Sequence, residues 1–210
     1  MANIKNIIFD LGNVIIDLDA GRTRQEMGRL MRHPDKMEST FDEIEKSIHV
    51  YETGDISDEL FINQLIKHAH PNVYAQQVIR AWNAMLIDIP EERLFFLSEL
   101  KNKGYRVFLL SNTNGIHLDW VNNYMKKNYN APSLDSWFER SYYSHLIRRR
   151  KPTINCFEYV LQDASLEALE TLFIDDTFEN IESAQSLGIR TIYLTGGHDV
   201  ISSLKSYLSL

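Results

Sequence analysis

A short apolar run near the start of the chain ends abruptly in a carboxylate, and this feature restricts the possible folds most. The run covers residues 4–9, and Asp10 follows it directly. It is rich in β-branched residues and too short to cross a membrane, so it is typical of a strand buried on both faces. Open α/β sheets place their ligands at the carboxyl ends of such strands. Asp10 is therefore the first candidate for a reacting group.

Later apolar runs repeat this pattern between segments of helical spacing. The runs 106–110 and 171–174 end in Ser111 and in the pair Asp175-Asp176, and a last run covers residues 190–194. Strands that alternate with helices predict an α/β fold with a Rossmann-like, three-layer parallel sheet and right-handed crossovers. The carboxyl ends of parallel strands lie along one edge, so the polar groups that follow these runs are expected to converge there.

One long segment departs from the alternation of strands and helices. From residue 20 to residue 87 the apolar residues recur at helical spacing, without strand-like alternation. Gly54 is a plausible helix end, and Ser57 a plausible start of the next helix. We predict that residues 20–87 form an inserted all-helical cap domain, and that residues 1–19 and 88–210 form the Rossmann-like core.

The predicted edge would combine acids with groups that bind phosphate. Its members are the Asp10 carboxylate, the Ser111 hydroxyl, the Asn112 amide, the Lys151 ammonium and the Asp175-Asp176 pair. Crowded carboxylates repel one another and require a cation, for which the oxygen-ligated Mg²⁺ is suited. A hydroxyl, amides and a lysine bind phosphate, and a carboxylate can attack phosphorus. The set indicates phosphoryl transfer helped by electrostatic stabilisation.

These residues also stand in a familiar order, and the sequence resembles the haloacid dehalogenase superfamily over its whole length, of the type with a helical cap. The four motifs are Phe9-Asp10-Leu11-Gly12-Asn13-Val14, Leu110-Ser111-Asn112, Lys151-Pro152 and Phe173-Ile174-Asp175-Asp176. Within the superfamily, residues 10–17 and 111–114 resemble a bacterial subgroup of sugar-phosphate phosphatases, one member of which acts on α-glucose 1-phosphate.

The resemblance implies a role for each motif residue. Asp10 is implied to be the nucleophile and a Mg²⁺ ligand, and Lys151 to pair with both the phosphate and Asp10. Ser111 and Asn112 are implied to hold the phosphoryl oxygens, in a phosphate site that also includes Gly12 and Asn13. In the implied metal site, Gly12 contributes its backbone carbonyl, Asp176 is the acidic ligand, and Asp175 supports it.

Gly12 is also the main departure from the superfamily pattern, because most phosphatases of this type carry a second aspartate there as general acid and base. Three interpretations remain open. The proton comes from another residue, from solvent or from the substrate; the leaving group needs little help, as for a sugar anomeric oxygen; or the protein is a poor catalyst. Loss of a general acid–base group weakens catalysis by about 10²–10⁴-fold without abolishing it. Asn180, where many relatives have an acid, is a smaller departure.

Composition limits the partners and the compartment. The net charge of −7 argues against nucleic acid as a partner. Cys156 is the only cysteine, which excludes an internal disulfide and fits a reducing compartment. No run has the roughly 20 apolar residues of a membrane span, and the start of the chain lacks the layout of a signal peptide. We expect a cytoplasmic monomer or homodimer that binds a small phosphorylated metabolite and no membrane.

The favoured function is a Mg²⁺-dependent phosphatase that acts through an aspartyl phosphate on Asp10, with a sugar phosphate as the favoured substrate. One alternative is a 2-haloacid dehalogenase, in which the same nucleophile attacks carbon and Asp176 has no clear role. The other is a catalytically weak protein of this fold that binds a phosphorylated metabolite or a protein partner, supported by Gly12. Glu52 and Trp82 are the candidates for cap residues that touch the substrate.

Overall fold

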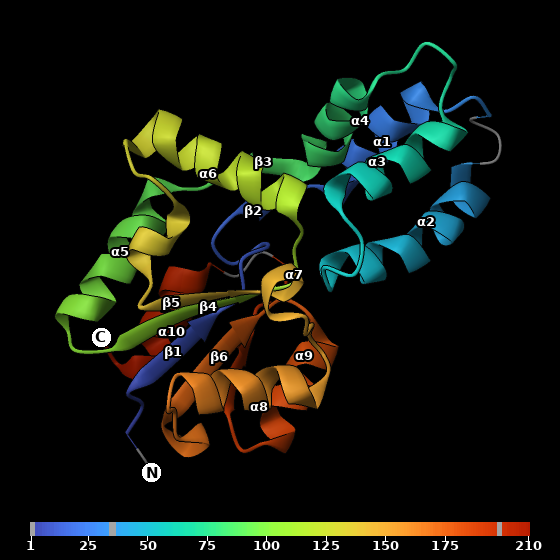
Figure 1. The fold of residues 1–210 in the computed structure, drawn as a ribbon. Coiled ribbons are helices and arrows are strands. Elements are labelled where there is room, and N and C mark those ends of the chain that lie inside the picture. Colours follow the sequence, from blue (N-terminus) through green and yellow to red (C-terminus); the bar gives the residue numbers. More distant parts are fainter. Residues whose placement is uncertain (1–2, 34–36, 197–198) are drawn as a thin grey trace.

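A parallel sheet forms the centre of the molecule (Figure 1). The structure is a computed structural model that describes residues 3–33, 37–196 and 199–210, with the backbone alone for residues 37–43. The sheet has the strand order β5-β4-β1-β6-β7, and each neighbouring pair is parallel. Its strands are β1 (Asn6–Phe9), β4 (Arg106–Ser111), β5 (Arg140–Tyr143), β6 (Thr171–Asp175) and β7 (Arg190–Tyr193). The predicted parallel α/β architecture is therefore confirmed.

Helices cover both faces of this sheet because alternate strand residues point to opposite sides. Ile7 and Phe9 of β1 face one hydrophobic cluster, whereas Ile8 belongs to the other. The first cluster is closed by α5 (Glu91–Asn102), α6 (Gly115–Tyr129) and α10 (Val200–Leu208). The second is closed by α8 (Ile154–Asp163) and α9 (Phe178–Ser186). The result is the expected three-layer arrangement, with β1 in the middle of the sheet.

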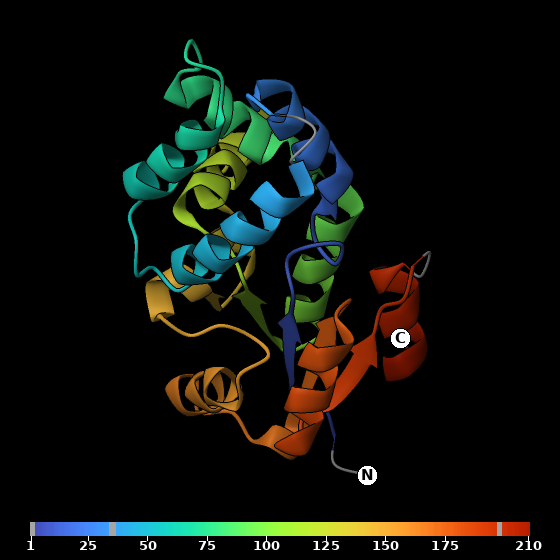
Figure 2. The ribbon, with the colours of Figure 1, turned by 90° about the vertical axis from the view of Figure 1, so that its right-hand side faces the viewer.

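A group of helices lies beyond the carboxyl ends of the strands (Figure 2). It consists of α1 (Ala20–Leu30), α2 (Met37–Glu52), α3 (Asp58–His68) and α4 (Ala75–Trp82). These helices share their own hydrophobic cluster, with Phe61 fully buried and stacked on Tyr51. We call α1–α4 the helical segment. It occupies the part of the chain predicted to form the cap, although the predicted boundaries at residues 20 and 87 stay a prediction.

The helical segment is joined to the sheet by a short two-stranded sheet that the sequence pattern did not reveal. Strand β2 (Asp17–Leu18) pairs antiparallel with β3 (Leu86–Asp88). Arg93 of α5 holds this connection through an ion pair of 2.8 Å with Asp17 and a hydrogen bond of 3.2 Å to the carbonyl of Ile15. Strands of two and three residues carry too few side chains to show a period of two, so only the structure reveals them.

Short helices complete the chain. They are η2 (Asn83–Met85), η3 (Leu134–Trp137), α7 (Ser144–Ile147) and η4 (Ala168–Glu170). The predicted helix end at Gly54 agrees with a helix α2 that stops at Glu52 and with a φ of +71° at the glycine. The predicted start at Ser57 is confirmed by the hydrogen bond from the Leu60 N–H to the Ser57 hydroxyl, 3.2 Å.

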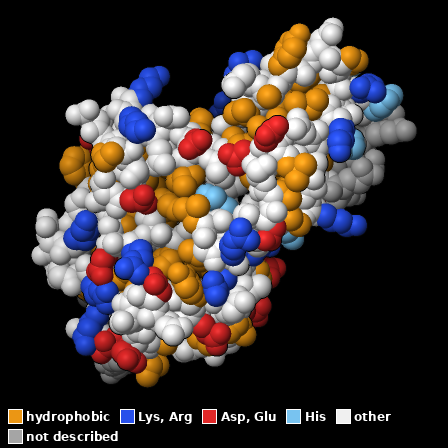
Figure 3. All heavy atoms as spheres, viewed as in Figure 1, with side chains coloured by type: hydrophobic (Ala, Val, Ile, Leu, Met, Phe, Trp, Pro, Cys, Tyr) orange, Lys and Arg blue, Asp and Glu red, His pale blue; other side chains and the backbone are white. Residues whose placement is uncertain are grey.

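The surface bears on the predicted partners. On the face shown in Figure 3, Lys and Arg side chains lie interspersed with Asp and Glu side chains, unlike the basic stripe that nucleic-acid binding requires. Within the described ranges, no helix combines the length and apolar character needed to cross a bilayer. The absence of a nucleic-acid partner stays a prediction.

Candidate active site

Lys151 is the centre of the polar cluster at the carboxyl ends of the strands. It lies in the segment before α8, and its ammonium Nζ is 2.6 Å from Asp10 Oδ1 and 2.6 Å from Asp175 Oδ2. Only 1% of Lys151 and 0% of Asp175 are exposed, and Asp10 is buried as well. The parallel sheet brings Asp10 and Asp175 together at the ends of β1 and β6, and the segment before α8 adds Lys151 between them.

The buried charges shift one another's ionisation. Burial raises the pKa of Asp10 to about 7, while the nearby Lys151 opposes this effect. For Lys151, burial lowers the pKa, but Asp10 and Asp175 outweigh it and hold the pKa above the ordinary value of a lysine. Lys151 therefore stays protonated, and its charge stabilises the ionised form of Asp10.

The two adjacent aspartates at the end of β6 have different environments. Asp175 accepts from the Thr177 N–H at 2.8 Å and from Asn180 Nδ2 at 3.0 Å to both oxygens, in addition to Lys151. Asp176 accepts from Asn13 Nδ2 at 2.8 Å and contacts the Thr177 hydroxyl at 3.4 Å. The Asp175 carboxylate is thus fully occupied by protein donors, whereas Asp176 has room for another partner.

Asp10, Asp175 and Asp176 each offer a carboxylate oxygen within 4.8 Å of the others. Such all-oxygen donors suit a hard divalent cation such as Mg²⁺. Because Asp175 is committed to Lys151 and Asn180, Asp10 and Asp176 are the better suited ligands of the three, in line with the predicted supporting role of Asp175. The roles of these residues toward a metal stay a prediction.

Ser111, the last residue of β4, and Asn112, which follows it, both face the cavity, and Asn112 also contacts the loop that carries Lys151. Ser111 and Asn112 both line the cavity that contains Asp10. The Asn112 side chain donates to the Lys151 carbonyl at 2.8 Å and accepts from the Lys151 N–H at 2.9 Å. Its carboxamide therefore positions Lys151. The predicted contact of Asn112 with a phosphoryl oxygen stays a prediction, for which its backbone N–H is the available donor. The Ser111 hydroxyl bonds only weakly, at 3.5 Å, to the Asn112 carbonyl.

The loop after Asp10 leaves little room for a side chain at position 12. A Cβ on Gly12 would lie 2.6 Å from Leu18 Cδ1, so the space for a side chain is filled by a residue of β2. Asn13 follows with φ of +53°, a conformation that asparagine tolerates, and its side chain bridges the Leu18 N–H and Asp176. Asn13, predicted in the phosphate site, thus uses its amide to fix this loop.

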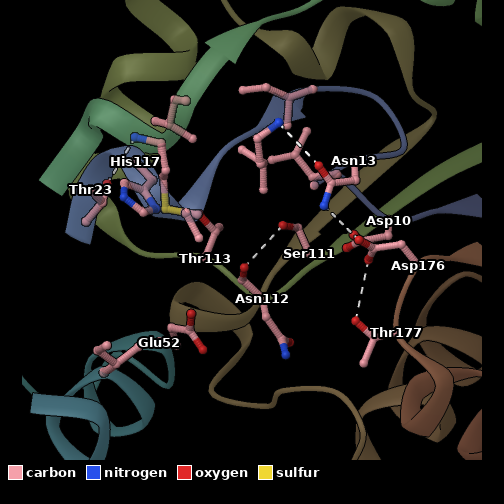
Figure 4. Close-up of a pocket in the computed structure, with 18 of the residues that line it drawn as sticks. Asp10, Asn13, Thr23, Glu52, Ser111, Asn112, Thr113, His117, Asp176 and Thr177 are labelled. Atoms are coloured by element: carbon pink, nitrogen blue, oxygen red, sulfur yellow. Dashed lines mark hydrogen bonds between the residues drawn. The ribbon is translucent and has the colours of Figure 1, made fainter. Parts of the chain in front are cut away.

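A cavity of about 680 Å³ opens from this cluster toward the helical segment. In Figure 4, Asp10, Asn13 and Asp176 lie at one end and Thr23 and His117 at the other, with the Glu52 carboxylate directed between them. Apolar residues complete the walls on the side of α1–α4: Ile16, Leu18, Ile48, Trp82, Met85 and Leu86. Both predicted substrate contacts, Glu52 and Trp82, line this cavity.

Residues that sequence reasoning passed over also belong here. Asn180, seen only as a departure from an acid, holds both oxygens of Asp175. His117 lines the cavity and is neutral, because burial lowers its pKa to about 4 although the Trp82 carbonyl opposes this effect. Its Nε2 lies 3.3 Å from that carbonyl. The position of Asn180 five residues after Asp175, on the first turns of a helix, was the available signal for its role; His117 offered none.

Comparisons with known proteins show which proteins this chain is similar to. A D-ribitol-5-phosphate phosphatase of Bacteroides thetaiotaomicron is 29% identical over 203 residues, covering 93% of this chain and 94% of that protein. A solved HAD family enzyme of the same organism, in complex with magnesium and inorganic phosphate, is 35% identical, with a TM-score of 0.82 and coverage of 94% and 97%. A predicted HAD-like hydrolase of Porphyromonas gingivalis is 30% identical, with a TM-score of 0.86 and full coverage of both chains.

A solved L-2-haloacid dehalogenase is 15% identical with a TM-score of 0.66, and this likeness shows the fold alone. The family model for haloacid dehalogenase-like hydrolases matches residues 7–194, which include all four motifs. The resemblance seen in the sequence is thereby confirmed. The chain belongs to the haloacid dehalogenase-like hydrolases.

Proposed function

We propose that this protein is a Mg²⁺-dependent phosphatase that hydrolyses a small phosphomonoester through an aspartyl phosphate on Asp10. The observation that carries the proposal is the buried Lys151, 2.6 Å from both Asp10 and Asp175, with Asp176 beside them at the mouth of a cavity. The Asp10 carboxylate supplies a nucleophile, and the Lys151 ammonium, together with a cation held by the acids, would offset the negative charge of a transferring phosphoryl group.

The reaction has two steps in this proposal. A carboxylate oxygen of Asp10 attacks phosphorus, the bond from phosphorus to the alcohol oxygen breaks, and the alcohol leaves with a proton. Water then attacks phosphorus, the bond from phosphorus to the Asp10 oxygen breaks, and inorganic phosphate is released with the Asp10 carboxylate restored. Lys151 favours the ionised, nucleophilic form of Asp10 before the attack and offsets the phosphoryl charge in both steps.

Asp10, Asp176 and the Gly12 carbonyl are the groups that would hold Mg²⁺, which neutralises phosphoryl charge when bound. The magnesium and phosphate in the solved relative support magnesium as the metal. Position 12 lacks a side chain for proton transfer, and of the other acids described along the cavity, Asp176 is assigned to the metal and Glu52 lies on the side of the helical segment. We therefore assign protonation of the leaving alcohol to solvent or to the substrate.

Sugar or polyol phosphates are the proposed substrates, with the helical segment acting as a cap over residues of the sheet edge. Support comes from the D-ribitol-5-phosphate phosphatase that shares 29% identity over nearly the whole chain. The cavity of about 680 Å³ has room for such a molecule. A cytoplasmic location and a monomeric or homodimeric state belong to the same proposal.

The test is phosphate release from a panel of phosphomonoesters with Mg²⁺ and with EDTA. We expect turnover only with the metal, and a loss on the order of 10⁴-fold in kcat for Asp10→Asn. Asp163→Asn is the matched control, because Asp163 ends α8 and does not line the cavity. Metal-independent release or an active Asp10→Asn variant contradicts the proposal. Halide release from 2-haloacids would support the dehalogenase alternative, and binding without turnover the non-catalytic one.

A further inference from the structure

Glu52 is a carboxylate that the reaction at Asp10 does not use. It is the last residue of α2, yet it lines the same cavity as Asp10, Ser111 and Lys151. Its side chain is 17% exposed, and Figure 4 shows its carboxylate directed into the cavity. A buried charge of this kind is costly unless it is paired and hydrogen-bonded, so its partners indicate what it is for.

Only half of the Glu52 carboxylate has a protein partner among the described residues. Oε2 accepts from Arg150 at 2.9 Å, and no hydrogen bond from a side chain or backbone that the structure describes reaches Oε1. Burial raises the pKa of Glu52 above its usual range, and the Arg150 guanidinium opposes this effect. A carboxylate oxygen that faces a cavity without a described donor is suited to accept a hydrogen bond from a bound molecule.

The backbone that carries Glu52 is held in place by contacts on both sides. The hydroxyl of the neighbouring Tyr51 donates to Asp58 at 2.5 Å and accepts from the Ile116 N–H at 3.2 Å, which ties α2 to α6. Gly54 lies so close to the His145 carbonyl that a Cβ would approach its oxygen to 2.2 Å. Glu52 is therefore preorganised, and little ordering opposes a contact with the ligand.

We propose that Glu52 determines specificity by accepting a hydrogen bond from a hydroxyl group in the leaving-group part of the substrate. Arg150 is the positioning residue that orients the acceptor. The inference rests on the proposed phosphatase function and deepens it, because it selects uncharged, hydroxylated alcohols over plain alkyl alcohols of the same length.

The experiment compares matched pairs of esters with Mg²⁺ present. Glycerol, erythritol and ribitol phosphates are paired with propyl, butyl and pentyl phosphates, so that each pair differs in hydroxyl groups. For the wild type we expect at least tenfold higher kcat/KM on the best hydroxylated ester than on its alkyl partner. Glu52→Gln should lower the ratio of the two kcat/KM values about tenfold, mainly by raising KM for the hydroxylated ester. The reason is that a neutral amide oxygen accepts a weaker hydrogen bond than a carboxylate does. Activity on the alkyl ester should change less than twofold.

Asp55→Asn is the matched control, because Asp55 also joins the helical segment to the sheet through an arginine, Arg148, but does not line the cavity. It should leave the preference unchanged, whereas Arg150→Gln should reduce it. Equal losses on both esters of a pair for Glu52→Gln, or a wild type without preference, overturn the inference while leaving phosphatase activity established. Failure of the proposed function is a different result, namely no phosphate release from any ester.

Discussion

The two ends of the cavity are built on different principles. At the sheet edge, Lys151, Asp10 and Asp175 are charged, buried and mutually paired at 2.6 Å. On the side of the helical segment, apolar side chains make up much of the wall, and the charged residues described there are Arg24 and Glu52, of which Glu52 is 17% exposed and paired with Arg150. A buried charge cluster depends on every member, whereas an apolar wall can change one residue at a time. The difference suits an edge that performs one reaction and a wall that selects the substrate.

The largest effect should come from breaking the charge cluster. Lys151→Met leaves Asp10 and Asp175 buried without their cation, and we expect a loss of about 3–5 kcal/mol in the free energy of unfolding together with loss of phosphatase activity. Urea denaturation at pH 8 in EDTA measures the loss. Lys5→Met removes an exposed ion pair with Glu170 and should cost less than about 1 kcal/mol. Equal costs for the two variants would contradict the distinction drawn between buried and exposed charges.

The two acids of this cluster could be predicted from the sequence because each lies at the end of an apolar strand. Asp10, Ser111 and Asp175 sit at or beside the carboxyl ends of β1, β4 and β6, so the topology of a parallel sheet suffices to bring them together. The helical segment was predictable for a similar reason, since apolar residues at helical spacing indicate helices without knowledge of their partners.

Side-chain partners could not be predicted in the same way. The commitment of Asn112 to the Lys151 backbone depends on how two loops meet, and so does the place of Leu18 over Gly12. The same holds for the pair of Glu52 with Arg150, residues 98 positions apart. Such contacts depend on angles and distances of a few ångströms between distant segments, and a residue pattern contains no information about them.

A smaller effect on stability is expected at His117 of α6, which contacts Trp82 of the helical segment. Its neutral ring lies between the Trp82 carbonyl and Asn114, and stacks on the Trp82 ring at 5.2 Å. Because burial lowers its pKa to about 4 from 6.5, the unfolded chain binds a proton more readily than the folded protein does below pH 6.5. Stability is therefore lost as the pH falls from 6.5 toward 4.

For the wild type we expect this histidine to contribute about 2 kcal/mol to the loss of unfolding free energy between pH 7 and pH 5. His117→Gln should flatten that part of the pH dependence, although the variant starts from a lower stability at pH 7. Urea titrations at several pH values in constant Mg²⁺ separate the two effects. A parallel pH dependence in the wild type and the variant would show that His117 does not titrate in this range.

A third prediction concerns the contact between the Asp10 loop and β2. Gly12→Ala places a Cβ against Leu18 Cδ1, and because that atom is the end of a flexible side chain, the cost should be about 1 kcal/mol. The double variant Gly12→Ala, Leu18→Ala should lose about 1 kcal/mol less stability than the sum of the losses in the two single variants. Full additivity would mean that Leu18 does not fill the space at position 12.

The smallest expected effect is the difference in coupling energy between two ion pairs that involve residues 52 and 55, at and just after the end of α2. Side chains in the pair of Arg148 and Asp55 are 70% and 53% exposed, against 24% and 17% in the pair of Arg150 and Glu52. Exposed pairs lose most of their attraction to water and salt, so a double-mutant cycle for Arg148 and Asp55 should give less than about 0.5 kcal/mol. The cycle for Arg150 and Glu52 should give more and depend less on salt. Equal coupling energies would mean that burial at the cavity does not strengthen the ion pair of Arg150 and Glu52. Arg150 would then orient the Glu52 carboxylate less strongly than its position indicates.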